Sequence, residues 1–263
     1  MSTPAKIVIV GAGRVAWHLG KRLRAKGIPV AQVLSRTAEH AESLALTLQT
    51  RWGGDWSEVI ADADWLLLAV RDDAIADVAA RLAPFVPDAL ITHTSGGTPG
   101  AVLKPHFRRY GVFYPLQSFS FERSPVWSKI PFCVDAQLED DVLFLKKMAK
   151  TVGNLVYRVN DEQRAALHVA AVFANNFTNH CFSIAEELLE EKNLPFELLH
   201  PLMEETLAKA LQGSPGRMQT GPAVRGDSET IRRHLLQLQG HPGWRELYEK
   251  LSESIHPDLK KDL

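Results

Sequence analysis

The chain has 263 residues, 45% of them hydrophobic, and a formal net charge of −1. This length is sufficient for two domains, each with its own core. A nearly neutral chain has no overall electrostatic attraction to nucleic acid or anionic lipid, so neither is expected as a partner. The longest apolar run, at residues 65–70, is far too short to span a bilayer.

The cysteine content and the N-terminal sequence suggest a cytoplasmic protein. Cys133 and Cys181 lie far apart, and neither has the spacing of a metal-ligand motif. We therefore expect two reduced thiols and no metal site. The N-terminus runs directly into a β-branched stretch, with no segment that resembles a signal peptide.

The first part of the chain alternates predicted strands and helices. Such alternation predicts an α/β fold, with a doubly wound, mostly parallel Rossmann sheet over residues 1–160. The expected strands are residues 6–10, 29–34, 65–70, 90–93, 109–114, 131–134 and 155–159, with a weak strand near 52–55. Helices are expected directly after residue 13 and at 38–48 and 74–82.

The second part, residues 161–263, is predicted to be an all-helical domain for substrate binding and dimerisation. Residues 161–193 contain neither glycine nor proline and keep helical spacing, which predicts a helix of about 30 residues against a usual 11–12. Further helices are expected from Pro195 to residue 211, from Asp227 or Ser228 to 238, and over 244–255. One small bundle cannot bury a helix that is apolar all round, so a homodimer through this domain is expected.

The first predicted strand leads into a glycine-rich turn that favours dinucleotide binding. The six residues of this turn are Gly11, Ala12, Gly13, Arg14, Val15 and Ala16. In a strand–turn–helix context, the first glycine permits the turn and the second lets the backbone approach a pyrophosphate. Ala16 stands in place of a third glycine and is still small enough for close helix–strand packing. The helix N-terminus offers unpaired N–H groups to the phosphates.

The end of the second strand indicates NADP(H) rather than NAD(H). An NAD site usually has Asp or Glu there for the ribose hydroxyls, whereas this chain has Ser35, Arg36 and Thr37. A guanidinium can pair with a 2′-phosphate, and the two hydroxyls can donate to it. An ordinary solvated arginine is the alternative interpretation.

Two later strand ends are expected to line the same crevice, because ligands of such sheets lie beyond the carboxyl ends of the strands. Val70, Arg71 and Asp72 follow one strand, and Ser95 and Gly96 follow the next. Ordinary turn chemistry would also explain these residues.

These features together resemble the 6-phosphogluconate dehydrogenase-like reductases, which include ketopantoate reductase, pyrroline-5-carboxylate reductase and the β-hydroxyacid dehydrogenases. More narrowly, four segments are similar to a bacterial family with a Rossmann-like domain and its own C-terminal helical domain. They are residues 93–96, 114–119, 168–180 and 221–227. The resemblance covers almost the whole chain. It implies an NADP-dependent reductase, and some members of the family are thought to act as an alternative ketopantoate reductase.

One departure from the broader group concerns its catalytic lysine. Those enzymes place Lys and Asn four residues apart on the long helix, but aligning either Asn175 or Asn176 puts Ala171 or Val172 at the lysine position. His168 lies one turn earlier, and its imidazole could supply the proton instead. The apolar neighbours of the asparagines suggest that they are buried and bind substrate, the other subunit or the Rossmann domain. A structural role is the alternative for His168.

Two residues are candidates for substrate binding. Arg225 lies in a Gly/Pro-rich loop, where its guanidinium could hold a carboxylate, although an ion pair with Asp227 is the alternative. Gln117 follows a predicted strand and could reach the pocket. The sequence thus predicts an NADP(H)-dependent oxidoreductase that reduces a small anionic carbonyl or imine substrate, such as the 2-oxoacid ketopantoate. An inactive NADP(H)-binding sensor and a reductase with a deazaflavin partner are the alternatives.

Overall fold

The computed structural model describes residues 5–261. The chain divides into two compact units that meet between Asn175 and Asn176. No helix within the described residues is both long enough and apolar enough to cross a membrane.

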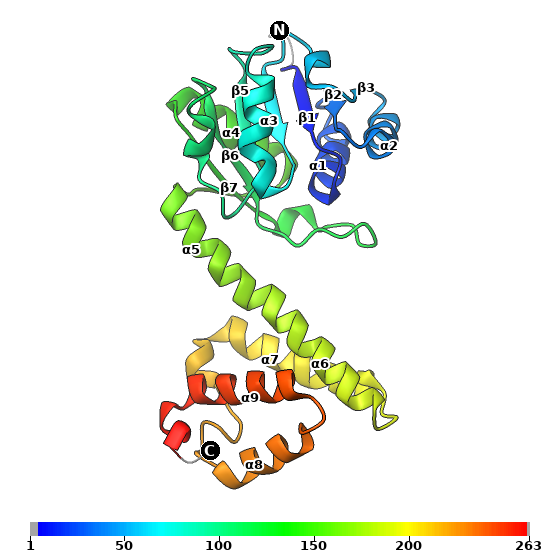
Figure 1. Cartoon of the computed structure of the whole chain (residues 1–263). Helices are drawn as coiled ribbons and strands as arrows, with labels where there is room; N and C mark the ends of the chain where they lie inside the picture. Colours follow the sequence, from blue (N-terminus) through cyan, green and yellow to red (C-terminus); the bar gives the residue numbers. More distant parts are fainter. Residues whose placement is uncertain (1–4, 262–263) are drawn as a thin grey trace. The chain divides into compact units, whose positions relative to one another are not determined.

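The first unit is built on one eight-stranded sheet with the order β3-β2-β1-β4-β5-β6-β7-β8 (Figure 1). All neighbouring strands pair in parallel except β6 and β7, which are antiparallel. The predicted α/β fold class is therefore confirmed. The strands are β1 (Ile7–Val10), β2 (Val30–Leu34), β3 (Arg51–Gly53), β4 (Trp65–Leu68), β5 (Leu90–His93), β6 (Tyr110–Pro115), β7 (Pro131–Ala136) and β8 (Leu155–Arg158).

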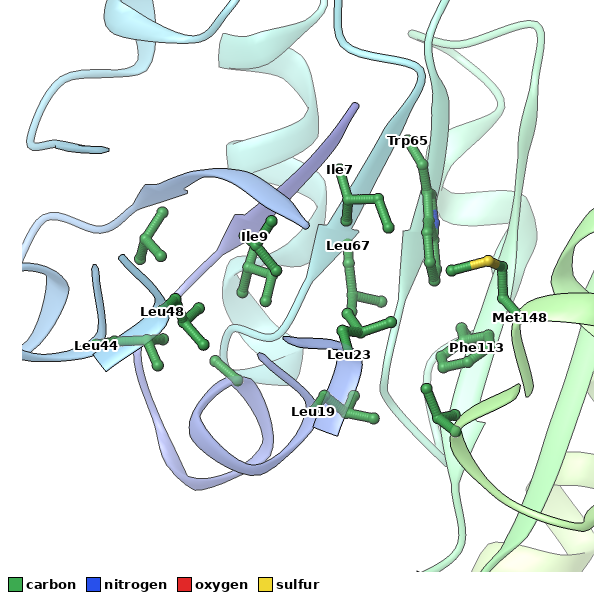
Figure 2. Close-up of a cluster of buried hydrophobic side chains, with 14 of the residues drawn as sticks. Ile7, Ile9, Leu19, Leu23, Leu44, Leu48, Trp65, Leu67, Phe113 and Met148 are labelled. Carbon is green, nitrogen blue, oxygen red and sulfur yellow. The ribbon is translucent and has the colours of Figure 1, made fainter. Parts of the chain in front are cut away.

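Helices cover both faces of this sheet, and the strand residues alternate between the two cores. Ile7 and Ile9 belong to one core, while Val8 and Val10 belong to the other. Figure 2 shows part of the first core, where Leu19 and Leu23 pack with Trp65. Helices α1 (Arg14–Ala25), α2 (Ala38–Leu48) and α4 (Glu139–Val152) contribute to it, and α3 (Ile75–Leu82) covers the opposite face.

Helix α4 is an element that the sequence analysis does not predict. Its buried residues Val142, Leu145, Met148, Ala149 and Val152 recur at helical spacing. Three acidic residues fill its first turn, which suits the positive end of a helix dipole. This helix supplies the connection that the parallel pair β7 and β8 requires.

The predicted long helix is present, but it contains a π-helical turn. It consists of α5 (Asp161–Ala171), the π-helical segment η5 (Val172–Phe177) and α6 (Thr178–Glu190). Asn160 caps its start by accepting a hydrogen bond from the backbone N–H of Gln163 at 2.9 Å. The compact units divide inside η5, further along the chain than the predicted boundary of residue 160. The first turns of α5 are hydrogen-bonded to the segment after β5.

The second unit is helical, as the sequence predicts. After α6 come α7 (His200–Gln212), α8 (Ser228–Gln237) and α9 (Pro242–Ile255), and Asp227 caps α8 through the N–H of Thr230. Its buried core is small, comprising Ala223, Ile231, Leu235 and Leu259. Several leucines of α7 and the turn before it are more than 60% exposed: Leu198, Leu202, Leu207 and Leu211.

Candidate cofactor and active site

The turn between β1 and α1 has the geometry of a phosphate-binding loop. Gly11 has a φ of 104°, and a Cβ at this position would collide with the carbonyl oxygen of Ala69. Gly13 is the N-cap of α1, carries no side-chain cap and is exposed, with open space beside its Cα. The first-turn N–H groups of a 12-residue helix are thus left for a ligand anion.

The remaining residues of the glycine-rich turn pack against neighbouring side chains. Ala16 is fully buried in the core, as expected for the position that brings helix and strand together. Val15 is half-buried and packs against the same core. The guanidinium of Arg14 lies 5.8 Å from the centre of the Phe121 ring, a cation–π contact on the following loop.

A cavity of about 250 Å³ opens beside this turn. It brings together the ends of β1, β2 and β4, as the fold predicts for a nucleotide site. The lining residues predicted from the sequence are Gly11, Ala12, Gly13, Ser35, Arg36, Thr37, Val70 and Arg71. The others are His40, Trp56, Ala69, Ala74 and Val78.

The charges around this cavity favour a phosphate-bearing ligand. Arg36, His40 and Arg71 line it, and none of the described lining residues is acidic. Arg71 is paired with Asp73 at 2.7 Å, whereas Arg36 makes no hydrogen bond or ion pair within residues 5–261. Thr37 begins α2 without a side-chain cap, so a second helix N-terminus reaches the site.

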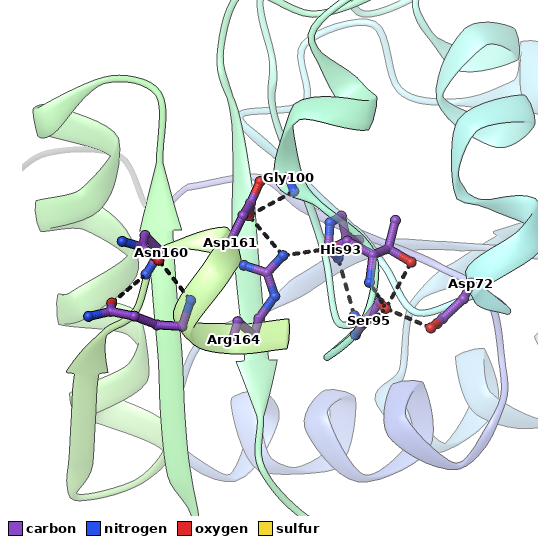
Figure 3. A network of polar contacts seen from close by, with 10 residues as sticks. Asp72, His93, Ser95, Gly100, Asn160, Asp161 and Arg164 are labelled. Atoms are coloured by element: carbon purple, nitrogen blue, oxygen red, sulfur yellow. Dashed lines mark hydrogen bonds and ion pairs between the residues drawn. The ribbon is translucent and has the colours of Figure 1, made fainter. Parts of the chain in front are cut away.

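A second polar cluster lies at the carboxyl end of β5 (Figure 3). The hydroxyl of Ser95 donates to Asp72 at 2.7 Å and accepts from the backbone N–H of Thr98 at 2.9 Å. This cluster links the segments that follow β4 and β5. Asp72, Ser95 and Gly96 do not line the 250 Å³ cavity. The residues that the sequence predicts for a single crevice therefore form two neighbouring groups.

His168 on α5 packs against this strand end. A Cβ built on Gly96 would lie 2.5 Å from Nδ1 of His168 and 2.9 Å from the hydroxyl oxygen of Tyr114. Only a glycine therefore permits this approach. Nδ1 is buried and has no hydrogen-bond partner within the described chain, while Nε2 is not enclosed in this way. Nε2 is therefore the ring nitrogen of His168 that is available to a ligand.

A buried arginine holds α5 to the segment after β5. Arg164 is 1% exposed, and its Nη2 donates to the carbonyl oxygen of Thr98 at 2.5 Å and to Asp161 at 2.8 Å. Asp161 also accepts from the backbone N–H of Gly100 at 3.0 Å. Burial raises the pKa of Asp161, but the hydrogen bonds from Gly100 and Arg164 outweigh burial and lower it overall. This network, shown in Figure 3, fixes the first turn of α5, and His168 lies one turn further along the helix than Arg164.

His93 lies beneath the same strand end as a neutral side chain. It is fully buried, and its Nδ1 accepts from the backbone N–H of Ser95 at 3.2 Å. Burial, together with the positive charge of Arg164, lowers the pKa of His93 to about 4. His93 is therefore an acceptor within the structure rather than a proton donor at neutral pH.

Other predicted site residues have different surroundings from those expected. Asn175 and Asn176 are exposed, so the expectation that they are buried is wrong for this chain; they lie in the π-helical turn, where neighbouring side chains do not cover them. Arg225 is 65% exposed and 4.0 Å from Asp227, a weak ion pair. The amide oxygen of Gln117 accepts from the N–H of Ser118 and is turned toward its own backbone.

Comparison with solved structures shows the class of this fold. The imine reductase of Myxococcus stipitatus is 15% identical, with a TM-score of 0.72 over 97% of this chain and 94% of that one. The reductive aminase of Aspergillus terreus is 14% identical, with a TM-score of 0.75 over 98% and 95%. At these identities the likeness establishes the fold alone.

More similar proteins show the family. The "putative NADP oxidoreductase BF3122" of Bacteroides fragilis is 42% identical, with a TM-score of 0.90 over 96% of this chain and 98% of that one. Residues 6–96 match the NADP oxidoreductase, coenzyme F420-dependent family, and residues 130–255 match a domain of unknown function, DUF2520. The chain therefore belongs to the same family as the Bacteroides protein.

One curated relative is a named enzyme. Pyrroline-5-carboxylate reductase of Pseudomonas aeruginosa is 36% identical over 107 residues, which are 40% of this chain. The chain matches only 39% of the length of that relative.

Proposed function

We propose that this protein uses NADPH to reduce a carbonyl or imine group of a small anionic substrate. The observation that carries the proposal is the cavity between the glycine turn and the end of β2. Its described lining residues include Arg36, which has no hydrogen-bond or ion-pair partner within residues 5–261, and none of them is acidic. The N-termini of α1 and α2, which have no side-chain cap, also reach the cavity. That set of groups suits a pyrophosphate and a 2′-phosphate better than two ribose hydroxyls.

The cofactor would be held by the residues of this cavity. The backbone at Gly11 to Gly13 and the start of α1 would bind the pyrophosphate. Ser35, Arg36 and Thr37 would bind the 2′-phosphate, and the half-buried ring of Trp56 offers an apolar wall. When bound, NADPH supplies the hydride; the protein contributes binding, orientation and a proton.

His168 is the proposed proton donor. Its imidazole is fixed by packing against Gly96, with Nδ1 enclosed and Nε2 available. The imidazolium form of His168 would pass its Nε2 proton to the substrate oxygen or nitrogen as the adjacent carbon accepts hydride, which leaves a neutral imidazole. Asn175 or Asn176 is the proposed hydrogen-bond donor to the same substrate atom.

The substrate is proposed to be a 2-oxoacid, such as ketopantoate, or a cyclic imino acid. A similar segment occurs in pyrroline-5-carboxylate reductase, and proteins with this fold include imine reductases. A carboxylate on the substrate would be bound by Arg225, whose pairing with Asp227 is long and exposed and so is readily exchanged.

A second candidate function is NADP(H) sensing without chemistry. It is favoured by the absence of a lysine at Ala171 or Val172, one of which takes the position of the catalytic lysine in the reductases that the sequence resembles. Loss of NADPH absorbance with a panel of 2-oxoacids and cyclic imino acids separates the two functions. The reductase predicts turnover with at least one member of the panel. NADPH binding without turnover of any member would favour the sensor.

A further inference from the structure

The hydroxyl group of Tyr114 lies beside His168, and both contact Gly96. Both side chains contact the same side of Gly96. A Cβ built on this glycine would lie 2.5 Å from Nδ1 of His168 and 2.9 Å from the hydroxyl oxygen of Tyr114. The two rings meet edge to face, with centres 6.4 Å apart. Tyr114 comes from β6 and His168 from α5, so the sheet and the helix bring together two polar groups that are 54 positions apart in the sequence, at the carboxyl end of β5.

Tyr114 differs from the two other tyrosines with buried or half-buried rings. The hydroxyl of Tyr110 donates to Gln137 at 2.7 Å, and that of Tyr248 pairs with His234 at 2.8 Å. The hydroxyl of Tyr114 makes no hydrogen bond within residues 5–261 and is not enclosed by protein. A hydroxyl with no partner among the described residues, placed beside His168, is available to donate a hydrogen bond to a ligand.

The surroundings of Tyr114 keep its phenol protonated. Burial is the main cause that raises the pKa of Tyr114; Cys133 and Asp72 add to it, while the positive charge of Arg164 opposes them. The group is therefore a hydrogen-bond donor at neutral pH, of the kind that stabilises negative charge developing on a substrate oxygen.

We infer that Tyr114 is a second catalytic residue of this site, whose hydroxyl donates a hydrogen bond to the substrate atom that receives the proton from His168. The inference rests on the proposed reductase function. Tyr114 gives up no proton in the step: its hydrogen bond strengthens as the substrate C=O or C=N bond becomes single, while hydride goes to carbon and the His168 proton goes to oxygen or nitrogen.

The direct test is ¹⁹F NMR of the full chain labelled with 3-fluorotyrosine. The chain has four tyrosines, and the Tyr114→Phe and Tyr110→Phe variants assign two resonances by their loss. The probes are NADP⁺ and then oxamate, an unreactive 2-oxoacid analogue. We expect the Tyr114 resonance to move with NADP⁺ or with the later addition of oxamate, while the Tyr110 resonance stays in place.

Kinetics supply the second readout. With any substrate that the wild type reduces, Tyr114→Phe should lower kcat about 10²-fold and leave NADPH affinity unchanged. Tyr110→Phe, which removes a hydroxyl from the same strand, should keep kcat.

The role of Tyr114 and the reductase function can fail separately. If the protein binds NADP⁺ but neither NADP⁺ nor oxamate changes the chemical shift of the Tyr114 resonance, the role of Tyr114 is refuted. The reductase proposal would still stand. Full kcat in Tyr114→Phe would refute the role of Tyr114 in the same way. Failure of the wild type to bind NADP⁺ would refute the proposed function itself, and the role of Tyr114 with it.

Discussion

The guanidinium of Arg164 donates a hydrogen bond to the carbonyl oxygen of Thr98 across 66 positions of sequence, at 2.5 Å. This contact joins the first turns of α5 to the segment after β5, where Ser95 and Gly96 lie. It explains why the helix that carries His168 belongs with the sheet for its first turns. Because Arg164 is 1% exposed, its loss would remove a buried donor from the Thr98 carbonyl and from Asp161, which would keep its hydrogen bond from the backbone of Gly100.

Replacing this arginine should destabilise the first unit. Arg164→Ala is expected to lower the free energy of unfolding by about 2–4 kcal/mol, because it removes the donor of the Thr98 carbonyl and the ion-pair partner of Asp161. Urea unfolding measures the change. The matched control is Arg81→Ala, whose pair with Asp77 is 60% exposed on both sides and should matter by less than about 1 kcal/mol. Equal effects of the two variants would contradict the assigned role of Arg164.

The neutral state of His93 predicts a loss of stability in mild acid. In the unfolded chain histidine takes up a proton near pH 6.5, whereas the folded state resists protonation until about pH 4. The unfolded state therefore binds more protons between these values, and stability falls as the pH drops from 6.5 to 4. The His93 contribution over this window is about 3 kcal/mol.

The matched variant for this prediction is His93→Asn, which keeps a hydrogen-bond acceptor and cannot titrate. Other groups near His93, namely Arg164, Asp161 and Asp72, are common to both proteins. The difference between the two curves of stability against pH should therefore isolate His93. If both curves had the same slope between pH 6.5 and 4, His93 would not be the group responsible.

Much of the fold follows from periodicity and turn chemistry. The strand at 90–93 and the helix at 38–48 begin and end as predicted, because their apolar patterns are bounded by clear breaks. Helix α4 was harder to predict, because three acidic residues open it and no glycine or proline marks its start. The π-helical turn at 172–177 has no sequence signature, so the faces deduced from α-helical spacing do not extend past it.

The candidate site was partly predictable for the same reason. Its glycine turn and Ser35, Arg36 and Thr37 are continuous in sequence and carry known chemistry. Tyr114 and Arg164 act through contacts that the fold creates between distant segments. Spacing along the chain cannot report such contacts.

The exposed leucines of the second unit predict a homodimer. Leu202, Leu207 and Leu211 are 63%, 61% and 78% exposed, more apolar surface than a helix usually leaves to water. Light scattering at micromolar concentration should give about twice the chain mass of 29.2 kDa. The double change Leu202→Glu and Leu207→Glu should give monomers, whereas Leu46→Glu, at a 73% exposed position of α2, should not. A wild-type monomer would refute this proposal.

The proton-donor role of His168 predicts a specific kinetic effect. His168→Ala should lower kcat by about 10²–10⁴-fold while NADPH affinity stays nearly the same. Arg225→Ala should instead raise KM, because it would bind the ground state and the transition state alike. Steady-state kinetics with an accepted substrate distinguish the two patterns. A His168→Ala enzyme with full kcat would end the assignment.

The central claim is that the cavity beside Arg36 selects NADPH, and fluorescence titration of the wild type with NADPH and NADH tests it most directly. A hydrogen bond to a charged group contributes about 1.5–3 kcal/mol, so NADPH should bind about 10–100-fold more tightly than NADH. Arg36→Ala should remove most of this difference by weakening NADPH and leave NADH unchanged. Equal affinity of the wild type for the two cofactors would contradict the account.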